Sequence, residues 1–210
     1  MLQKRPENCN NYQSWQSNIL EDVNNDCVLI RRILDGETGA FETLVRKYQR
    51  LVSHIVYRMK VQSEDYEDIC QDVFMRVFRS LDSFRSDAKL STWIGRIAYN
   101  RCVDYMARPK DDYLEEFIAA GHEPPADNMF SPFEMAERAE LGRLLRHEIG
   151  RLPAHYATIV TLFHLDEMTY TEIGDIMDLP EGTVKSYLFR ARRMLRERLT
   201  SGYTKEAWWP

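Results

Sequence analysis

The sequence predicts an all-α protein built from two small helical domains that are joined by an acidic, flexible linker. Apolar residues recur every three or four positions through most of the chain, which is the periodicity of amphipathic helices. No run of alternating apolar and polar residues is bounded by hairpin turns, so strands are not predicted. With 210 residues, 44% of them hydrophobic, the chain can bury one large core or two small ones.

Charge is segregated along the chain in a way that separates the two lobes. Residues 111–137 carry eight acidic side chains and no Lys or Arg. Residues 76–108 carry seven basic and three acidic side chains, and residues 181–198 carry six and two, so each has a balance of +4. Because the whole chain has a formal charge of −5, any binding of polyanions must be local to these two basic segments.

The first lobe is predicted at residues 24–108, after a polar, Asn-rich arm over residues 1–23 that has no sustained periodicity. Its first long amphipathic helix covers residues 41–56. Ser63 is a candidate N-cap for the next helix, whose acidic first turn suits the positive helix end. The apolar stripe of that helix consists of Ile69, Val73, Val77 and Leu81.

A polar turn over residues 83–89 precedes the last helix of this lobe, which covers residues 90–105. A connector follows at residues 109–131, where Pro and Gly interrupt any periodicity, so we expect it to be extended. The second lobe is predicted at residues 132–200, and residues 201–210 form a C-terminal tail.

A helix-turn-helix is predicted within the second lobe. Thr169 and Glu172 have the T-x-x-E spacing of a capping box that opens a short helix. The turn at residues 178–182 is short enough to make the next helix cross the first one, as in proteins that bind the DNA major groove. The buried stripe of that second helix consists of Val184, Leu188, Ala191, Leu195 and Leu199.

The opposite face of the second helix is basic and rich in hydrogen-bond donors. Such side chains pair with guanine edges and with phosphates. A basic, solvated helix on an ordinary bundle is the alternative interpretation. The candidate DNA-binding residues are Thr183, Lys185, Ser186, Tyr187, Phe189, Arg190 and Arg193.

The first lobe carries a second nucleic-acid signal, in which aromatic and basic residues alternate over residues 84–108. Trp93 is suited to stack on an unpaired base and Asn100 to contact a base edge. Core packing of Trp93 is an equally good interpretation. The basic residues suited to contact phosphates here are Arg85, Lys89, Arg96 and Arg101.

Three sequence blocks resemble the extracytoplasmic-function (ECF) group of the bacterial sigma-70 family of RNA polymerase sigma factors. They are "DYEDICQDVFMRVFRSLDSF" (65–84), "LSTWIGRIAYNRCVDY" (90–105) and "LPAHYATIVTLFHLDEMTYTEIGDIMDLPEGTVKSYLFRARRML" (152–195). The resemblance extends over residues 28–108 and 133–199. It implies a transcription initiation factor in which the first lobe is region 2 and the second lobe is region 4.

The resemblance assigns a partner to each lobe. The helix from Asp65 would grip the clamp helices of the largest subunit of bacterial core RNA polymerase, and residues 152–165 would seat the second lobe on the polymerase flap. The segment from Phe84 to Asn100 would capture the melted minus-ten strand, and the helix from Thr183 would bind the minus-thirty-five element. The candidate polymerase contacts are Asp68, Gln71, Asp72, Arg76 and Arg79.

The resemblance also implies regulation by an anti-sigma factor, location in the bacterial cytoplasm or near the membrane through that partner, and no obligate homo-oligomer. The acidic connector would either mimic nucleic acid in a polymerase channel or act as a solvated spacer. Tyr187 departs from the basic residue common at its position in relatives. The tail residues Trp208 and Trp209 either pack on the second lobe or dock a regulator.

Two other classes of protein are alternatives. A stand-alone helix-turn-helix regulator explains the second lobe but leaves the aromatic and basic pattern of the first lobe without a task. An enzyme is disfavoured, because no H-E-x-x-H, phosphate-binding loop or nucleophile motif is present, and no cofactor is implied. The four cysteines have no C-x-x-C or zinc-finger spacing, which favours reduced, partly buried thiols over a metal site, with redox sensing as the alternative. No membrane span is predicted.

Overall fold

The computed structural model describes residues 25–107 and 142–202, and every regular element within these ranges is a helix. The all-α prediction is thereby confirmed. The predicted arm, connector and tail fall largely or wholly outside the described residues. The first lobe contains a helix over 25–34, α2 (Ala40–Arg58), α3 (Tyr66–Ser80), the 3₁₀ turn η1 (Leu81–Ser83) and α4 (Leu90–Met106). The second lobe contains a helix over 142–150, α6 (Ala154–His164), α7 (Tyr170–Met177) and α8 (Glu181–Gly202).

The apolar stripes that predict the helices are the stripes that the fold buries. In α3 the buried residues are Ile69, Val73 and Val77, and Leu81 is buried in the turn that follows. The predicted N-cap is wrong, because α3 begins at Tyr66 with Asp65 at the N-cap position and no side-chain cap. The acidic first turn, with Glu67 and Asp68, still compensates the helix dipole there.

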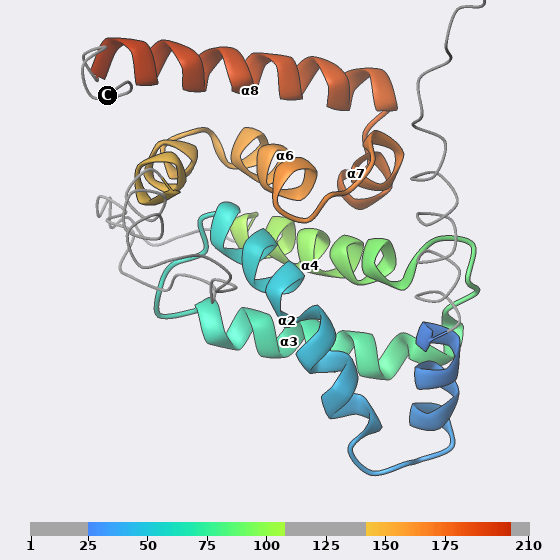
Figure 1. The fold of residues 1–210 in the computed structure, drawn as a ribbon. Coiled ribbons are helices and arrows are strands. Elements are labelled where there is room, and N and C mark those ends of the chain that lie inside the picture. Colours follow the sequence, from blue (N-terminus) through green and yellow to red (C-terminus); the bar gives the residue numbers. More distant parts are fainter. Residues whose placement is uncertain (1–24, 108–141, 203–210) are drawn as a thin grey trace, which may run out of the picture.

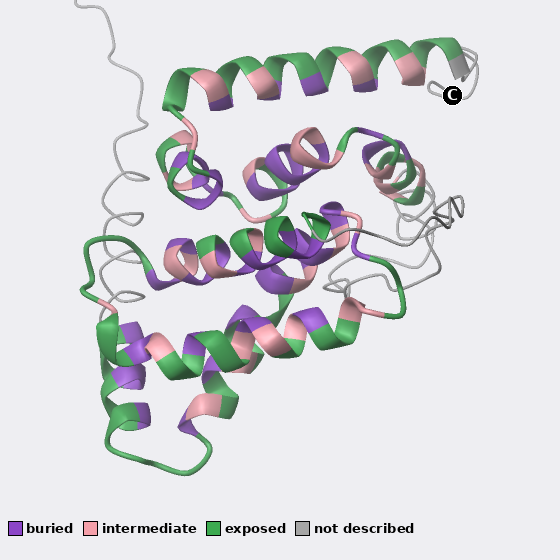
Figure 2. Cartoon of the chain, turned by 180° about the vertical axis from the view of Figure 1, so that it is seen from behind, coloured by how far each residue is buried: buried purple, intermediate pink, exposed green. Residues whose placement is uncertain are grey.

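The elements form layers, with α8 at one end, α6 and α7 beneath it, α2 and α4 next, and α3 at the far side (Figure 1). The buried faces of the helices point inward from layer to layer (Figure 2). Helix α4 packs on α7 and α2 packs on α6, so the two lobes are in direct contact. Their buried apolar side chains form one continuous hydrophobic core.

Polar contacts along α2 tie the first lobe to the second. His54 Nδ1 lies 2.9 Å from a carboxylate oxygen of Asp166, and both side chains are buried. Arg58 Nε donates to the hydroxyl of Thr161 at 3.0 Å, and burial lowers the pKa of this guanidinium. Arg50 donates to the carbonyl oxygen of Leu165 at 2.8 Å. These three α2 side chains find their partners in the second lobe, which makes the contact between lobes partly polar.

Within the described ranges, no helix combines the length and the apolar character that crossing a bilayer would require.

Candidate nucleic-acid interface

The helix-turn-helix forms as the sequence predicts. The hydroxyl of Thr169 accepts from the backbone N–H of Glu172, and the Glu172 carboxylate accepts from the backbone N–H of Thr169 at 2.8 Å. Helix α7 ends at Met177, and its C-cap residue Asp178 adopts the left-handed conformation with φ of 55°. A Cβ on Gly174 would lie 2.6 Å from the carbonyl oxygen of Leu179, so only glycine lets the turn close this tightly. The sequence interpretation did not single out Gly174.

Helix α8 presents its polar face to solvent. Val184, Leu188, Ala191 and Leu195 are buried, as predicted. Four residues on the opposite side of the helix are exposed, and we call them the α8 outer face: Ser186, Phe189, Arg190 and Arg193. Phe189 is 68% exposed, the largest exposed fraction among the exposed large hydrophobic residues of the described ranges. An exposed aromatic residue between arginines is an arrangement suited to a thymine methyl group and neighbouring phosphates.

The other predicted residues of α8 lie at the edge of this face. Tyr187 is half-buried, and its ring centroid lies 5.4 Å from those of both His155 and Tyr156. Thr183 is half-buried as well. Lys185 pairs with Glu181 at 2.5 Å, and this hydrogen bond raises the pKa of the lysine. Tyr187 therefore supports the helix-turn-helix in addition to flanking its outer face.

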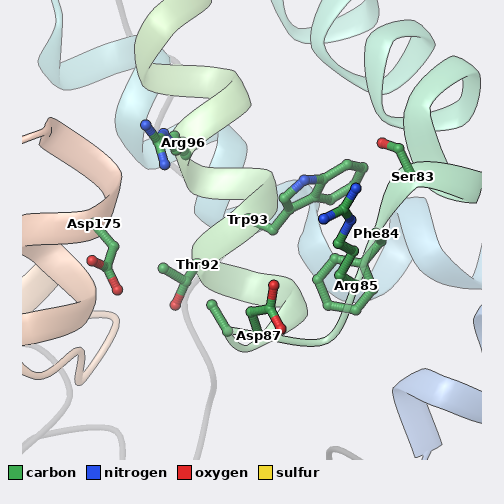
Figure 3. A pocket seen from close by; sticks show the side chains of 9 residues that line it. Ser83, Phe84, Arg85, Asp87, Thr92, Trp93, Arg96 and Asp175 are labelled. Carbon is green, nitrogen blue, oxygen red and sulfur yellow. The ribbon is translucent and has the colours of Figure 1, made fainter.

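Three of the six predicted minus-ten residues, Arg85, Trp93 and Arg96, line a pocket of about 280 Å³ (Figure 3). The rings of Phe84 and Trp93 pack together, with centroids 5.4 Å apart, so half-buried Trp93 both supports the fold and faces the pocket. One residue of the second lobe, Asp175 of α7, completes the lining. The lining residues are Ser83, Phe84, Arg85, Asp87, Ala88, Thr92, Trp93, Arg96 and Asp175.

The remaining minus-ten candidates have different surroundings. Asn100 is exposed on α4. The ammonium of Lys89 lies 2.8 Å from a carboxylate oxygen of Glu172 in α7. Burial opposes ionisation of Glu172, but hydrogen bonds from Lys89 and Thr169 keep its pKa below the ordinary value. The second lobe thus already neutralises one of the predicted phosphate contacts.

Arg101 requires a correction. Its side chain is buried, and its Nε donates to Asp72 at 2.5 Å, so in this conformation the guanidinium is closed to a DNA phosphate. The hydrogen bond from Arg101 lowers the pKa of Asp72 and keeps the carboxylate ionised. Both residues occupy the α3–α4 interface, where the pair ties the two helices together.

The predicted polymerase contacts share the outer side of α3. Asp68, Gln71, Arg76 and Arg79 are exposed, and Asp72 is half-exposed. The same helix exposes two large apolar residues that the sequence interpretation missed, Met75 at 42% and Phe78 at 51%. Their positions outside the buried stripe could have indicated them. Exposed apolar residues with charged neighbours are typical of a protein-binding surface.

Two of the three described thiols lie wholly or partly inside the fold. Burial raises the pKa of Cys70 to about 11 and that of Cys102 to about 12, so both thiols are protonated at neutral pH. Cys27 is exposed. In the described parts of the chain, no three His, Cys, Asp or Glu side chains cluster in a way that could hold a metal ion.

Comparison with family models and known proteins fits these surfaces. Residues 44–111 match the model for sigma-70 region 2, and residues 142–195 match that for sigma-70 region 4. The chain is 34% identical over 177 residues to the ECF RNA polymerase sigma factor SigW of Bacillus subtilis (strain 168), covering 81% of this chain and 94% of that relative. It is 36% identical over 176 residues to the ECF RNA polymerase sigma-E factor of Escherichia coli (strain K12), covering 81% and 92%.

Two solved structures share the fold. CnrH, in complex with the cytosolic domain of CnrY, superposes with a TM-score of 0.59 at 22% identity, covering 84% of this chain and 97% of that one. The sigma factor RpoE of Bartonella quintana, in complex with the anti-sigma factor NepR, gives 0.55 at 18% identity, covering 77% and 98%. The two family models and the sequence relatives together show that the chain belongs to the ECF RNA polymerase sigma factors, which direct RNA polymerase to promoters in transcription initiation.

Proposed function

We propose that the two lobes divide promoter recognition between them, with residues 132–200 binding the minus-thirty-five duplex and residues 24–108 binding the minus-ten strand. The observation that carries this proposal is the exposed α8 outer face behind a correctly capped helix-turn-helix. Arg190 and Arg193 would contact guanine edges or phosphates, and Phe189 would contact a thymine methyl. Thr183, Lys185 and Tyr187 would contribute from the edge of the face.

The pocket beside α4 would hold an unstacked base of the minus-ten element. Trp93 supplies a ring for stacking, and Arg85 and Arg96 supply positive charge at the rim. Lys89 and Asn100 would contact the strand on either side. Arg101 would act as a positioning residue, because its ion pair with Asp72 holds α4 against α3.

The outer side of α3 would bind core RNA polymerase. Its mixture of charged residues with exposed Met75 and Phe78 supports this role, because protein interfaces combine an apolar centre with a polar rim. Polymerase would perform all the chemistry, so this chain would be no enzyme and need no cofactor. Residues 109–131 would serve as the linker between the lobes.

An anti-sigma factor is the regulator that we propose for this chain. CnrH and the Bartonella RpoE share its fold, and RpoE is described in complex with an anti-sigma factor. Such a partner would keep the chain in the bacterial cytoplasm, in some cases close to the membrane.

Reconstitution tests the proposal. The full chain is mixed with bacterial core RNA polymerase and a library of genomic DNA fragments, and complex formation and transcript start sites are measured. We expect a stable complex and discrete new transcripts, from which the promoter elements can be aligned. Sharp shifts of duplex DNA without any polymerase complex would instead identify a stand-alone regulator.

A further inference from the structure

The two predicted DNA-binding sites are close together in this structure, and a promoter requires them to be far apart. Helix α4 packs on α7 and α7 packs on α8, so two helix-packing distances, roughly 20 Å, separate α4 from α8. Elements named minus-ten and minus-thirty-five lie about 25 base pairs apart, which is roughly 85 Å of B-form DNA. The lobes must therefore separate before one molecule can bind both elements.

The chain between the lobes is long enough for this separation. The residues from 108 to 141 number 34, and a fully extended segment of that length spans at most roughly 120 Å. Separation would break the α2–α6 and α4–α7 contacts. Because His54 and Arg58 can exchange their partners Asp166 and Thr161 for water, part of this contact is inexpensive to open.

The α4–α7 contact borders the minus-ten site, where Arg85, Arg96 and Asn100 stay exposed. Glu172 pairs with Lys89 at 2.8 Å, and Asp175 lines the pocket that holds Trp93 and Arg96 (Figure 3). Both carboxylates come from α7 of the second lobe. They place negative charge beside the same basic residues that the phosphates of a bound strand would approach.

Two details show that the α4–α7 contact is tightly packed but leaves a buried polar group without a hydrogen bond. The Thr92 hydroxyl is buried at the pocket and has no hydrogen-bond partner among the described residues, which is unfavourable for a polar group. At Gly95 the helices approach so closely that a Cβ would lie 2.8 Å from the Cδ1 of Ile176. The lobes therefore meet tightly over Gly95 and leave a polar group of α4 unsatisfied beside it.

We infer that α7 is an intramolecular inhibitor of the minus-ten site, in which Glu172 and Asp175 take the place of single-stranded DNA phosphates until the lobes separate. This inference rests on the proposed function. Free protein is then a poor binder of single-stranded DNA, and docking on polymerase uncovers the pocket by pulling the lobes apart. The inhibition needs no second protein.

The decisive variant is Glu172→Gln combined with Asp175→Asn in the full chain. It removes both carboxylates at constant size, and glutamine can still serve in the capping box with Thr169. The matched control is Asp35→Asn with Glu64→Gln, which removes the same charge from exposed positions outside the α4–α7 contact. The measurement is fluorescence anisotropy with a labelled single-stranded oligonucleotide of about 12 random nucleotides, a length that suits such grooves.

We expect the affinity of the free protein for this probe to rise at least tenfold in the Glu172/Asp175 variant and less than twofold in the control. A second variant, Gly95→Leu, opens the lobes without a change of charge. It should raise the radius of gyration in solution scattering and also increase probe binding, whereas Gly182→Ala, where a Cβ meets open space, should do neither.

Equal affinity of the Glu172/Asp175 variant and its charge control would overturn the inference, whatever the result for Gly95→Leu. The failure of the proposed function has a different signature, because wild-type protein would then form no complex with core polymerase. Wild-type transcription with unchanged probe binding in the Glu172/Asp175 variant would leave the sigma-factor function intact and reject only the inhibition by α7.

Discussion

The predicted DNA-binding sites on α8 and α4 differ in what lies next to them. The α8 outer face lies at one end of the layered molecule and is open to solvent, whereas α4 packs on α7 of the other lobe, which brings Glu172 and Asp175 beside the predicted minus-ten residues (Figure 1). The two sequence segments that contain these helices, residues 76–108 and 181–198, have the same net charge of +4. The difference teaches that local composition sets the capacity to bind DNA, and the tertiary contact decides which site is available.

Arg190→Ala tests the open face, and we expect the largest effect from it. Loss of a bidentate or phosphate contact should weaken binding of a minus-thirty-five duplex by about 1–3 kcal/mol, or about 5- to 150-fold. The loss should already be seen with the free protein, because Arg190 is exposed in this structure. Arg192→Ala is the matched control, since Arg192 turns toward His164 and the ring of Phe163.

Polymerase binding should be unchanged in both arginine variants. A loss of duplex binding in Arg192→Ala as large as in Arg190→Ala would contradict the assignment of the α8 outer face.

Asp72→Asn tests the ion pair with Arg101 that holds α4 against α3. Without this carboxylate, buried Arg101 loses its ion pair, and we expect a loss of about 1 kcal/mol, at the low end because Asp72 is half-exposed. This corresponds to a melting temperature about 2–4 °C lower. Thermal melting followed by circular dichroism measures it.

The pH dependence of that difference has a defined sign. Arg101 lowers the pKa of Asp72 in the folded protein below its ordinary value of 3.8, so the stabilisation is present at neutral pH and is lost as the pH falls through the lowered pKa. The gap between wild type and Asp72→Asn should therefore shrink below about pH 4. A gap that stays constant down to pH 3 or so would show that the carboxylate charge is not its cause.

Arg96→Ala gives the smallest expected effect and the sharpest contrast with Arg190→Ala. Because Arg96 lines the same pocket as Asp175, whose negative charge opposes the approach of a phosphate, its loss should have little effect on the weak probe binding of the free protein. In the Gly95→Leu background, the same change should weaken binding several-fold and reduce the salt slope by about 0.7, the value for one single-strand phosphate. A several-fold loss in the wild-type background would mean that the pocket is already open.

Much of the fold could be predicted because each helix is specified locally. The apolar stripe of α3 and the capping box of α7 depend on residues three or four positions apart, and both are found as expected. The exposed α8 outer face followed from the same periodicity. The start of α3 was misplaced, since Ser63 and Asp65 are both acceptable N-caps and the chain uses the later one.

The contact between the lobes could not be predicted in this way. His54 and Asp166 are 112 positions apart, and no periodicity in either segment indicates the other. The burial of Arg101 also depends on a partner from another helix, Asp72. Sequence patterns identify which residues can bind phosphate, but the packing of distant segments determines which of them is already paired.

Gly174 and the α8 outer face together define how promoter preference can change in evolution or by design. The turn tolerates no side chain at Gly174, because the Leu179 carbonyl occupies that space. The exposed positions of α8 carry no comparable constraint, since Ser186, Phe189, Arg190 and Arg193 point away from the core. Exchanges confined to these four positions should yield factors with new target sequences on an unchanged scaffold, which is what an orthogonal set of transcription switches requires.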